Sequence, residues 1–329
     1  MGVSANPTVS IIVVSYNTRD MTVACLNSVI AETSQTTYEL IVIDNASTDG
    51  SAEAIAAISS ARLMASEINL GFAAANNVAA QDARGEFLLF FNPDTVVLNE
   101  AITRLVAFAR QYPNAQIWGG RTLFGNRTLN PASCFRRMTL WNQFCAATGL
   151  SALLKNNPIF NSEFYGGWQR DHVREVDVVT GCFFLVRRAL WEQLGGFDRL
   201  FFMYGEETDF CLRARPLGAR PIVTPDATIV HYGGASELVR ADKLVKILKA
   251  KVTLMNRHWG TAKRSLGRSM FWLFPLTRIA GYWLAKHLLS KGTADRHFQE
   301  WRQVWTRRSE WIEGFDKTTG LRSGPERAP

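Results

Sequence analysis

The chain has 329 residues, of which 47% are hydrophobic and 20% charged, so it can bury a sizeable core as one large or two modest domains. Its five cysteines include no Cys-x-x-Cys pair, which argues against a zinc ladder or a disulfide framework and suits a reducing cytosol. The polar N-terminus lacks the basic-then-apolar layout of a signal peptide, so a cytoplasmic protein is expected.

The net charge of +8 is unevenly distributed along the chain. Residues 1–235 carry 18 Lys and Arg against 21 Asp and Glu, whereas residues 236–329 carry 19 against 8. A basic tail on a nearly neutral body usually meets an anionic partner, either nucleic acid or a membrane surface, although a solvated helical face would show the same excess. We therefore divide the chain into two expected parts, 1–235 and 236–329.

The first hundred residues alternate between apolar runs and helical spacing. The predicted strands are residues 9–15, 40–43, 61–65 and 87–91. The predicted helices between them are residues 20–30, 51–59 and 69–81. Because the strands read as nearly continuous apolar runs and alternate with helices, they indicate an α/β fold with a mainly parallel, twisted sheet covered by helices.

Polar elements follow three of these strands. They are Ser-Tyr-Asn at 15–17, Asp44-Asn45 and Asn92-Pro-Asp94. Ligands of such sheets bind beyond the carboxyl ends of the strands, which favours a binding site there with Asp94 as a metal ligand. Ordinary turn chemistry would also place polar residues at strand ends. The absence of a G-x-G-x-x-G turn and of a Walker lysine loop disfavours a Rossmann dehydrogenase and a P-loop NTPase.

The second half of the sequence is less regular. Residues 112–170 predict loops with short helices and strands, because they are rich in Asn, Arg and aromatic residues. Residues 176–186 predict a strand that is interrupted at Thr180-Gly181. A glycine inside a strand often marks a place where a ligand or another backbone approaches closely.

Three carboxylates lie within four residues, at Glu206, Glu207 and Asp209. Acidic side chains in the first turn of a helix are each stabilised by about 0.3–1 kcal/mol through the helix dipole, and this explanation fits Asp209 best. A general base that faces a diphosphate site is the alternative, since an aromatic wall can tune the pKa of such a carboxylate.

Seven motifs occur in a recognisable order between residue 9 and about residue 236. They are VSIIVVSYN, VIDNASTDGS, NLGFAAANN, FFNPDT, TGCFFLVRR, GGFDRLFFMYGEETDFCLR and IVHYGGAS. In this order the chain resembles the family 2 glycosyltransferases, and within them the rhamnosyltransferases that act on lipid-linked acceptors in cell-wall or polysaccharide biosynthesis. The resemblance implies a GT-A fold, a nucleotide-diphosphate sugar donor, a divalent cation (Mg²⁺ or Mn²⁺) and inversion at the anomeric carbon. It favours dTDP-rhamnose as the donor, with a UDP-sugar as the fallback.

The resemblance also implies roles for single residues. Tyr16 would stack near the nucleobase and Asp44 would hydrogen-bond it. Asp94 would bind the metal, and Asn92 stands where the family's Asp-x-Asp element begins, so one anionic ligand is lost. His231 would be the second protein ligand of the metal. The other residues implied to bind the nucleotide sugar are Asn17, Asn69, Gly71, Asn77 and Gly181.

The catalytic base of the family is the second residue of a Glu-Asp pair. Here that position is Glu207, whose side chain is one methylene longer, and Asp209 is the alternative base. The implied reaction is a single displacement in which the base takes the proton of an acceptor hydroxyl as that oxygen attacks the sugar.

The tail combines cations with apolar and aromatic side chains. Residues 238–255 predict a basic amphipathic helix. Residues 271–289 are long enough for a membrane span, but Arg278 near the middle would cost about 2.5–3.5 kcal/mol. We therefore expect peripheral attachment to the inner face of the plasma membrane, with a helical cap on the core as the alternative. The tryptophans expected in the headgroup layer are Trp272, Trp283, Trp301, Trp305 and Trp311.

Three rival functions remain open. A nucleotidyltransferase shares the expected fold and metal site, but usually has a glycine- and cation-rich loop after the first strand, where this chain has Ser-Tyr-Asn-Thr-Arg. Nucleic-acid binding is not expected, since no such motif occurs and the tail's cations are interleaved with apolar residues. A non-catalytic basic protein is disfavoured by the intact Asp94, Glu207 and His231.

Overall fold

The computed structural model describes residues 6–233, 240–289 and 292–316. The strands are β1 Val9–Ser15, β2 Tyr38–Asn45, β3 Ala61–Ser66, β4 Phe87–Phe91, β5 Thr95–Val97, β6 Ile117–Leu123, β7 Cys134–Phe135, β8 Arg174–Glu175, β9 Val178–Val179, β10 Phe183–Arg187 and β11 Ile222–His231. The helices are α1 Arg19–Ala31, α2 Ser51–Ala56, α3 Gly71–Gln81, α4 Ala101–Gln111, α5 Leu140–Thr148, α6 Leu150–Leu153, α7 Arg188–Leu194, α8 Glu206–Ala214, α9 Arg240–His258, α10 Thr261–Leu289 and α11 Gly292–Thr306.

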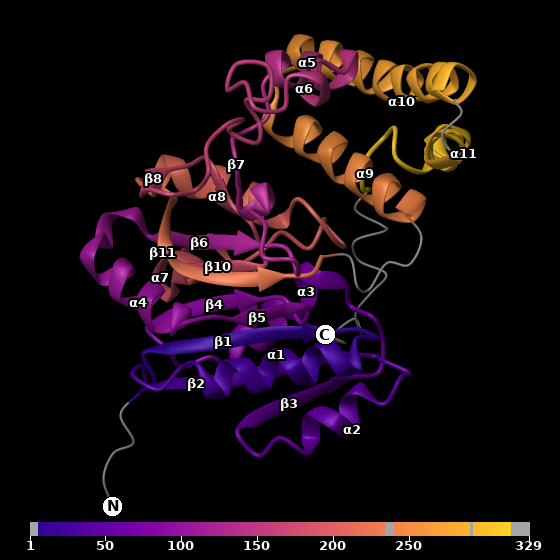
Figure 1. Ribbon diagram of the computed structural model, residues 1–329. Helices are drawn as coiled ribbons and strands as arrows, with labels where there is room; N and C mark the ends of the chain where they lie inside the picture. Colours follow the sequence, from indigo (N-terminus) through magenta and orange to yellow (C-terminus); the bar gives the residue numbers. More distant parts are fainter. Residues whose placement is uncertain (1–5, 234–239, 290–291, 317–329) are drawn as a thin grey trace, which may run out of the picture.

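A nine-stranded sheet forms the body of the molecule, and α5, α9, α10 and α11 gather above it (Figure 1). The strand order is β3-β2-β1-β4-β10-β6-β11-β5, with β8 paired to β11. The strands β3, β2, β1 and β4 run parallel, as predicted, whereas β10 runs antiparallel to both of its neighbours. The parallel half therefore brings the carboxyl ends of β1, β2 and β4 to one edge.

The run of β1 is buried on both faces, as its sequence predicts. Ile11 and Val13 belong to a core that includes side chains of α1, α2 and α4. Ile12 belongs to a second core that includes side chains of α3, α7 and α8. Because neighbouring residues of a strand point to opposite faces, a strand covered by helices on both sides needs apolar residues throughout.

The strand β6 lies in the middle of the sheet, within a segment for which mainly loops are predicted. Its sequence, IWGGRTL, contains two glycines, which weaken the pattern of a strand. A Cβ atom added at Gly120 would lie 2.1 Å from the carbonyl oxygen of Ala227 in β11. The glycine is thus required by close packing against a neighbouring strand, a reason that no local pattern reveals.

The helices α9, α10 and α11 share a hydrophobic cluster of their own, which includes Val245, Met255 and Phe271. Trp301 and Trp311 are also in this cluster, with exposed fractions of 5% and 0%. Their predicted place in a headgroup layer is therefore wrong, because the helical layer needs them as its core. Along the described part of the chain, no helix combines the length and apolarity that crossing a bilayer requires.

The predicted division of the chain at residues 235 and 236 lies outside the described residues, and it stays a prediction. The same holds for the last residues of the IVHYGGAS motif and for residues 238 and 239 at the start of the predicted basic helix.

Candidate functional site

The structure brings Asp94 and His231 together, although they lie far apart in the sequence. The strands β5 and β11 pair antiparallel so that His231 lies opposite Thr95, the residue after Asp94. The amide of Tyr232 also donates to the main-chain carbonyl of Asp94, at 3.0 Å. The Oδ1 atom of Asp94 is consequently 3.3 Å from Nε2 of His231.

The two side chains are mostly shielded from water and hold each other ionised. Burial alone would raise the pKa of Asp94, which is 6% exposed, but the hydrogen bond and the charge of His231 lower it below its usual value. Burial alone would lower the pKa of His231, but the Cys182 sulfur and the Asp94 carboxylate raise it to about 10. A cation bound here would therefore have to displace a proton from the imidazole.

The residues at this point fit a divalent metal. Asn92 contributes a side-chain oxygen, Oδ1, that is buried and has no hydrogen-bond partner among the described atoms. Its Nδ2 atom lies 3.4 Å from Nε2 of His231. A carboxylate, an imidazole and an amide oxygen are donors that Mg²⁺ and Mn²⁺ accept, with diphosphate oxygens or water completing the set. Within the described ranges, no cluster of three or more His, Cys, Asp or Glu side chains offers a metal site made by the protein alone.

Asp44 lies near the end of β2, and Tyr16 directly follows the neighbouring β1. The parallel register places Ser15 opposite Asp44, and Tyr16 follows as a half-buried side chain. Asp44 is 3% exposed, and its Oδ2 atom accepts a hydrogen bond from the amide of Ser47 at 3.0 Å. Its Oδ1 atom is buried and has no partner among the described atoms. Because such an atom is costly to leave unpaired, it could accept a hydrogen bond from a ligand.

Asn17 holds the two neighbouring loops together. Its Oδ1 atom accepts a hydrogen bond from the main-chain amide of Thr48 at 2.8 Å. The main-chain amide of Asn17 donates to the hydroxyl of Ser47 at 3.0 Å. The side chain thus fixes the loop after β2 against the end of β1.

Asn69 and Gly71 shape the turn before α3. The Oδ1 atom of Asn69 accepts hydrogen bonds from Nδ2 of Asn45 and from the amide of Gly71, both at 2.9 Å. Gly71 has a φ of +77°, and a Cβ atom added there would lie 2.5 Å from the carbonyl oxygen of Phe202. Glycine is therefore required where this turn meets the loop that leads into α8.

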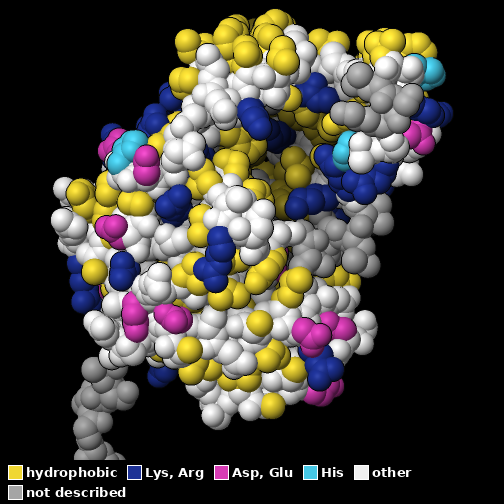
Figure 2. Space-filling view, viewed as in Figure 1, with side chains coloured by type: hydrophobic (Ala, Val, Ile, Leu, Met, Phe, Trp, Pro, Cys, Tyr) yellow, Lys and Arg dark blue, Asp and Glu magenta, His cyan; other side chains and the backbone are white. Residues whose placement is uncertain are grey.

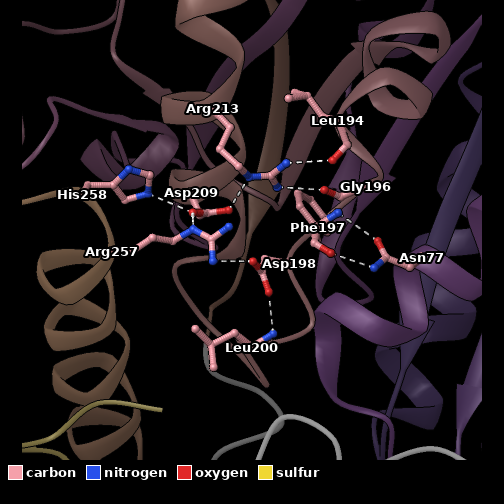
Figure 3. A network of polar contacts seen from close by, with 10 residues as sticks. All are labelled: Asn77, Leu194, Gly196, Phe197, Asp198, Leu200, Asp209, Arg213, Arg257 and His258. Carbon is pink, nitrogen blue, oxygen red and sulfur yellow. Dashed lines mark hydrogen bonds and ion pairs between the residues drawn. The ribbon is translucent and has the colours of Figure 1, made fainter. Parts of the chain in front are cut away.

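Asn77 joins α3 to the same loop from another side (Figure 3). Its Nδ2 atom donates to the carbonyl of Phe197 at 2.8 Å, and its Oδ1 atom accepts from the amide of Phe197 at 2.9 Å. Gly181 lies beside Cys182, whose carbonyl accepts a hydrogen bond from the amide of Asn92 at 3.3 Å. The contacts predicted between these residues and a nucleotide stay predictions.

The acidic cluster begins α8, and all three carboxylates lie in its first turn. Glu206 is 4% exposed, and its Oε2 atom has no hydrogen-bond partner among the described atoms. Burial raises the pKa of Glu206 well above its usual value, and the charge of Glu207 raises it further. Burial also raises the pKa of Glu207, which is half-buried. A carboxylate whose pKa lies nearer neutrality is suited to accept a proton.

Asp209 has a different environment (Figure 3). It is fully buried, its Oδ2 atom accepts from Nε of Arg213 at 2.7 Å, and its Oδ1 atom accepts from Nε of Arg257 and Nε2 of His258, both at 2.8 Å. Burial would raise the pKa of Asp209, but these hydrogen bonds and charges lower it below its usual value. Its carboxylate is occupied by three donors.

No motif of the sequence indicates a role for Arg257 or His258. They end α9, about fifty positions after Asp209, and Arg257 also pairs with Asp198 at 2.5 Å. Ordinary cations at the end of a basic helix carry no signal of a distant buried partner, so no sequence pattern could have identified them.

Comparisons with known proteins bear on the family and the fold of the chain. The model of the "Glycosyl transferase family 2" matches residues 10–194. A relative from Myxococcus xanthus, the "O-antigen biosynthesis protein RfbC", is 28% identical over 253 residues, which are 74% of this chain but only 18% of that protein. A relative from Mycobacterium tuberculosis, an "N-acetylglucosaminyl-diphospho-decaprenol L-rhamnosyltransferase", is 27% identical over 59% of this chain and 66% of its own length.

Among solved structures, the mannosyltransferase PcManGT from Pyrobaculum calidifontis, in complex with GDP-Man and Mn²⁺, is similar with a TM-score of 0.56. It is 19% identical, and the match covers 94% of this chain and 86% of that one. At this identity the likeness concerns the fold alone, and it confirms the expected GT-A fold. Since the family model matches more than half of the residues, the chain belongs to the glycosyl transferase family 2.

Proposed function

We propose that this protein is an inverting glycosyltransferase that moves rhamnose from dTDP-rhamnose to a hydroxyl of a lipid-linked saccharide. The observation that carries the proposal is the 3.3 Å approach of Asp94 to His231, at the sheet edge where Asp44 keeps a buried oxygen unpaired. The name of the M. tuberculosis relative supports rhamnose and a diphosphate-linked lipid acceptor. A UDP-sugar is the alternative donor.

In this proposal different side chains bind the nucleobase and the diphosphate of the donor. The Oδ1 atom of Asp44 accepts a hydrogen bond from the nucleobase of the donor, and Tyr16 stacks beside the nucleobase. Asp94, His231 and the Oδ1 atom of Asn92 hold a divalent cation. When bound, Mg²⁺ or Mn²⁺ supplies positive charge that stabilises the leaving nucleoside diphosphate.

Glu207 is the proposed base. Its raised pKa results from burial at the start of α8, and it accepts the proton of the acceptor hydroxyl as that oxygen attacks the sugar. Asp209 is proposed as a positioning residue, because three donors occupy its carboxylate. It would hold α8, and with it Glu207, against α9.

Donor binding can be tested by thermal unfolding with dTDP, UDP and GDP, each with Mn²⁺ and with EDTA. A ligand that binds only the folded state at 100 times its dissociation constant stabilises it by about 2.7 kcal/mol. We expect the largest rise in unfolding temperature with dTDP and Mn²⁺, and little rise with EDTA. No metal-dependent rise with any of the three nucleotides would refute the proposed donor site.

The base can be tested by Glu207→Gln. Loss of a proton-transfer base typically lowers turnover by about 10²–10⁴-fold, and binding of dTDP with Mn²⁺ should be unchanged. Glu206→Gln is the matched control, because it makes the same exchange one position earlier in α8, at a carboxyl that is 4% exposed. A slow Glu206→Gln enzyme beside a fully active Glu207→Gln enzyme would show that the base is misassigned.

We also propose that the protein attaches to an anionic membrane surface through α10 and the neighbouring α5. The two helices are joined where Nη2 of Arg278 donates to the carbonyl of Ala146 at 2.7 Å. Figure 2 shows hydrophobic side chains gathered over this upper face. The exposed apolar side chains of the two helices are Trp141, Phe144, Leu266, Trp272, Leu273, Leu276, Trp283, Leu284 and Leu288.

Flotation with phosphatidylglycerol vesicles tests this attachment. Changing Trp272, Leu276 and Trp283 to serine should abolish flotation, since each loses apolar area that the bilayer would bury. The matched control changes Ile68, Val78 and Phe124, which are exposed apolar residues of the sheet body, to serine. Equal flotation of both triple variants would exclude α10 as the attachment face.

A further inference from the structure

A groove of about 650 Å³ lies between α8, the segment after β7 and the junction of α9 with α10. Its lining includes the cations Arg137, Arg215, Arg220 and Lys263, together with His258. No carboxylate of the described chain lines it. The cations come from three separate segments, so the fold, and not one run of sequence, gathers their charge.

A second hollow of about 400 Å³ adjoins the groove and shares Arg137 and Arg215 with it. It adds Arg136 and Arg174, whose guanidinium carbons lie 5.2 and 4.7 Å from the ring centre of Tyr165. Such cation–π contacts hold a guanidinium in place, which lowers the entropy cost of binding an anion. These two arginines therefore extend a positioned basic surface.

The carboxylates beside the second hollow leave this charge largely uncompensated. Asp177 pairs with Arg215 at 3.0 Å and also accepts from the amide of Arg137 at 3.0 Å. Glu175 is exposed to water. The two hollows are thus lined by two carboxylates and by six cationic side chains, namely Arg136, Arg174 and the four cations of the groove.

The first turn of α10 also favours a negatively charged ligand. Lys263 and Arg264 stand in the first turn of this helix, which contains no acidic residue. Cations at this end of a helix are destabilised by the helix dipole, whereas an anion there is stabilised. An anion in the groove would relieve the repulsion among the cations and that between Lys263 and the helix.

We propose that this groove binds the phosphate groups of a diphosphate-bearing molecule, at a site separate from the Asp94–His231 pair. Guanidinium groups match phosphate oxygens with two parallel hydrogen bonds, and lysine adds a point charge. The volume is that of a small-molecule site. Thr208, the neighbour of Glu207 in α8, also lines the groove, so a bound diphosphate would lie beside the acidic cluster.

The proposal goes beyond the proposed transfer reaction, because it concerns residues that bind neither the donor nor the metal. It can therefore fail while the donor site holds, or hold while the donor site fails. The phosphate groups could belong to a soluble or lipid-linked diphosphate, or to the headgroups of anionic lipids, which present the same chemistry.

The test is calorimetric titration of the full chain with inorganic pyrophosphate in EDTA, which removes any metal-dependent binding. A groove variant changes Arg137, Arg220 and Lys263 to glutamine, and a control variant changes Arg104, Arg110 and Arg127, which are exposed on the sheet body, to glutamine. Both lose three positive charges. We expect pyrophosphate affinity to fall by more than about tenfold in the groove variant and to stay within about twofold in the control.

Circular dichroism should show that both variants are folded, since the exchanged side chains are exposed. Equal pyrophosphate affinity of the three proteins, or no binding by the natural chain, would overturn the proposal. Vesicles then identify the source of the phosphate. If pyrophosphate releases the natural chain from phosphatidylglycerol vesicles, lipid headgroups occupy the groove. If pyrophosphate binds and releases nothing, the ligand is a separate diphosphate.

Discussion

Two buried aspartates among the described residues each face the Nε2 atom of a histidine, and their surroundings differ. Asp209 meets His258 at 2.8 Å and is also bonded to Arg213 and Arg257, so its carboxylate is saturated. Asp94 meets His231 at 3.3 Å, and the neighbouring Oδ1 atom of Asn92 has no partner among the described atoms. In one place the Asp–His pair belongs to a network in which both carboxylate oxygens accept hydrogen bonds from side chains. In the other place it lies beside an amide oxygen that has no partner among the described atoms.

The role of a buried carboxylate thus depends on which hydrogen-bond donors its oxygens already have. A saturated buried carboxylate contributes to the stability of the fold and has little left to offer a ligand. A carboxylate with one side-chain partner, next to an amide oxygen that is unpaired among the described atoms, gains from binding a cation. The comparison therefore predicts that the two aspartates, changed in the same way, will fail in different ways.

Asp94→Asn should have the largest effect, and it should fall on binding. Metal affinity typically drops by about 10–100-fold when a residue that only supports a ligand is lost, so loss of the ligand itself should weaken metal-dependent dTDP binding by more than about 100-fold. Calorimetric titration with dTDP, with Mn²⁺ and with EDTA, measures it. Unchanged affinity for dTDP in Mn²⁺ would mean that the Asp94–His231 pair, like Asp209 and His258, stabilises the fold and does not bind the metal.

Asp209→Asn should instead lower stability. Breaking a buried ion pair costs about 3–5 kcal/mol, and the partial exposure of Arg213 and Arg257 places the loss near the lower end. Urea unfolding measures the free energy of unfolding.

Asp226→Asn, at an exposed position, is the matched control and should change stability by less than about 0.5 kcal/mol. Asp94→Asn should lose less than half as much stability as Asp209→Asn, because Asp94 has one side-chain partner and Asp209 has three. Equal losses for the two variants would remove the distinction between the pairs.

The first pair could be predicted from the sequence and the second could not. Asp94 follows β4 and His231 ends β11, each within a motif of the family, and ligands of such sheets bind beyond the carboxyl ends of the strands. Two of the three partners of Asp209, Arg257 and His258, come from the end of α9 and reach it through tertiary contacts that no spacing records. The same limit explains why the sequence predicts short strands within residues 112–170 without placing β6, and why it predicts a membrane surface for Trp301 and Trp311. Local patterns identify strands and their ends, but not which helix covers them.

The two pairs should also lose their contributions to the stability of the fold at opposite ends of the pH range. The pKa of Asp209 is lower in the folded state than its usual 3.8, so its stabilising contribution is present above that value and is lost as the pH falls through the folded pKa. The pKa of His231 rises from 6.5 to about 10 on folding, so its contribution is present below pH 6.5 and is lost as the pH rises toward 10.

Urea unfolding in EDTA between pH 7 and pH 9 should thus show a loss of up to about 1.4 kcal/mol per pH unit that His231→Gln reduces and Asp209→Asn leaves unchanged. Metal-dependent dTDP binding should strengthen over the same interval, because the cation and the proton compete for one nitrogen. If stability falls with pH equally in the natural chain and in His231→Gln, the imidazole does not carry the proton that a metal would have to displace. His231 would then be a neutral structural residue, and the contrast between the two pairs would rest on Asp94 alone.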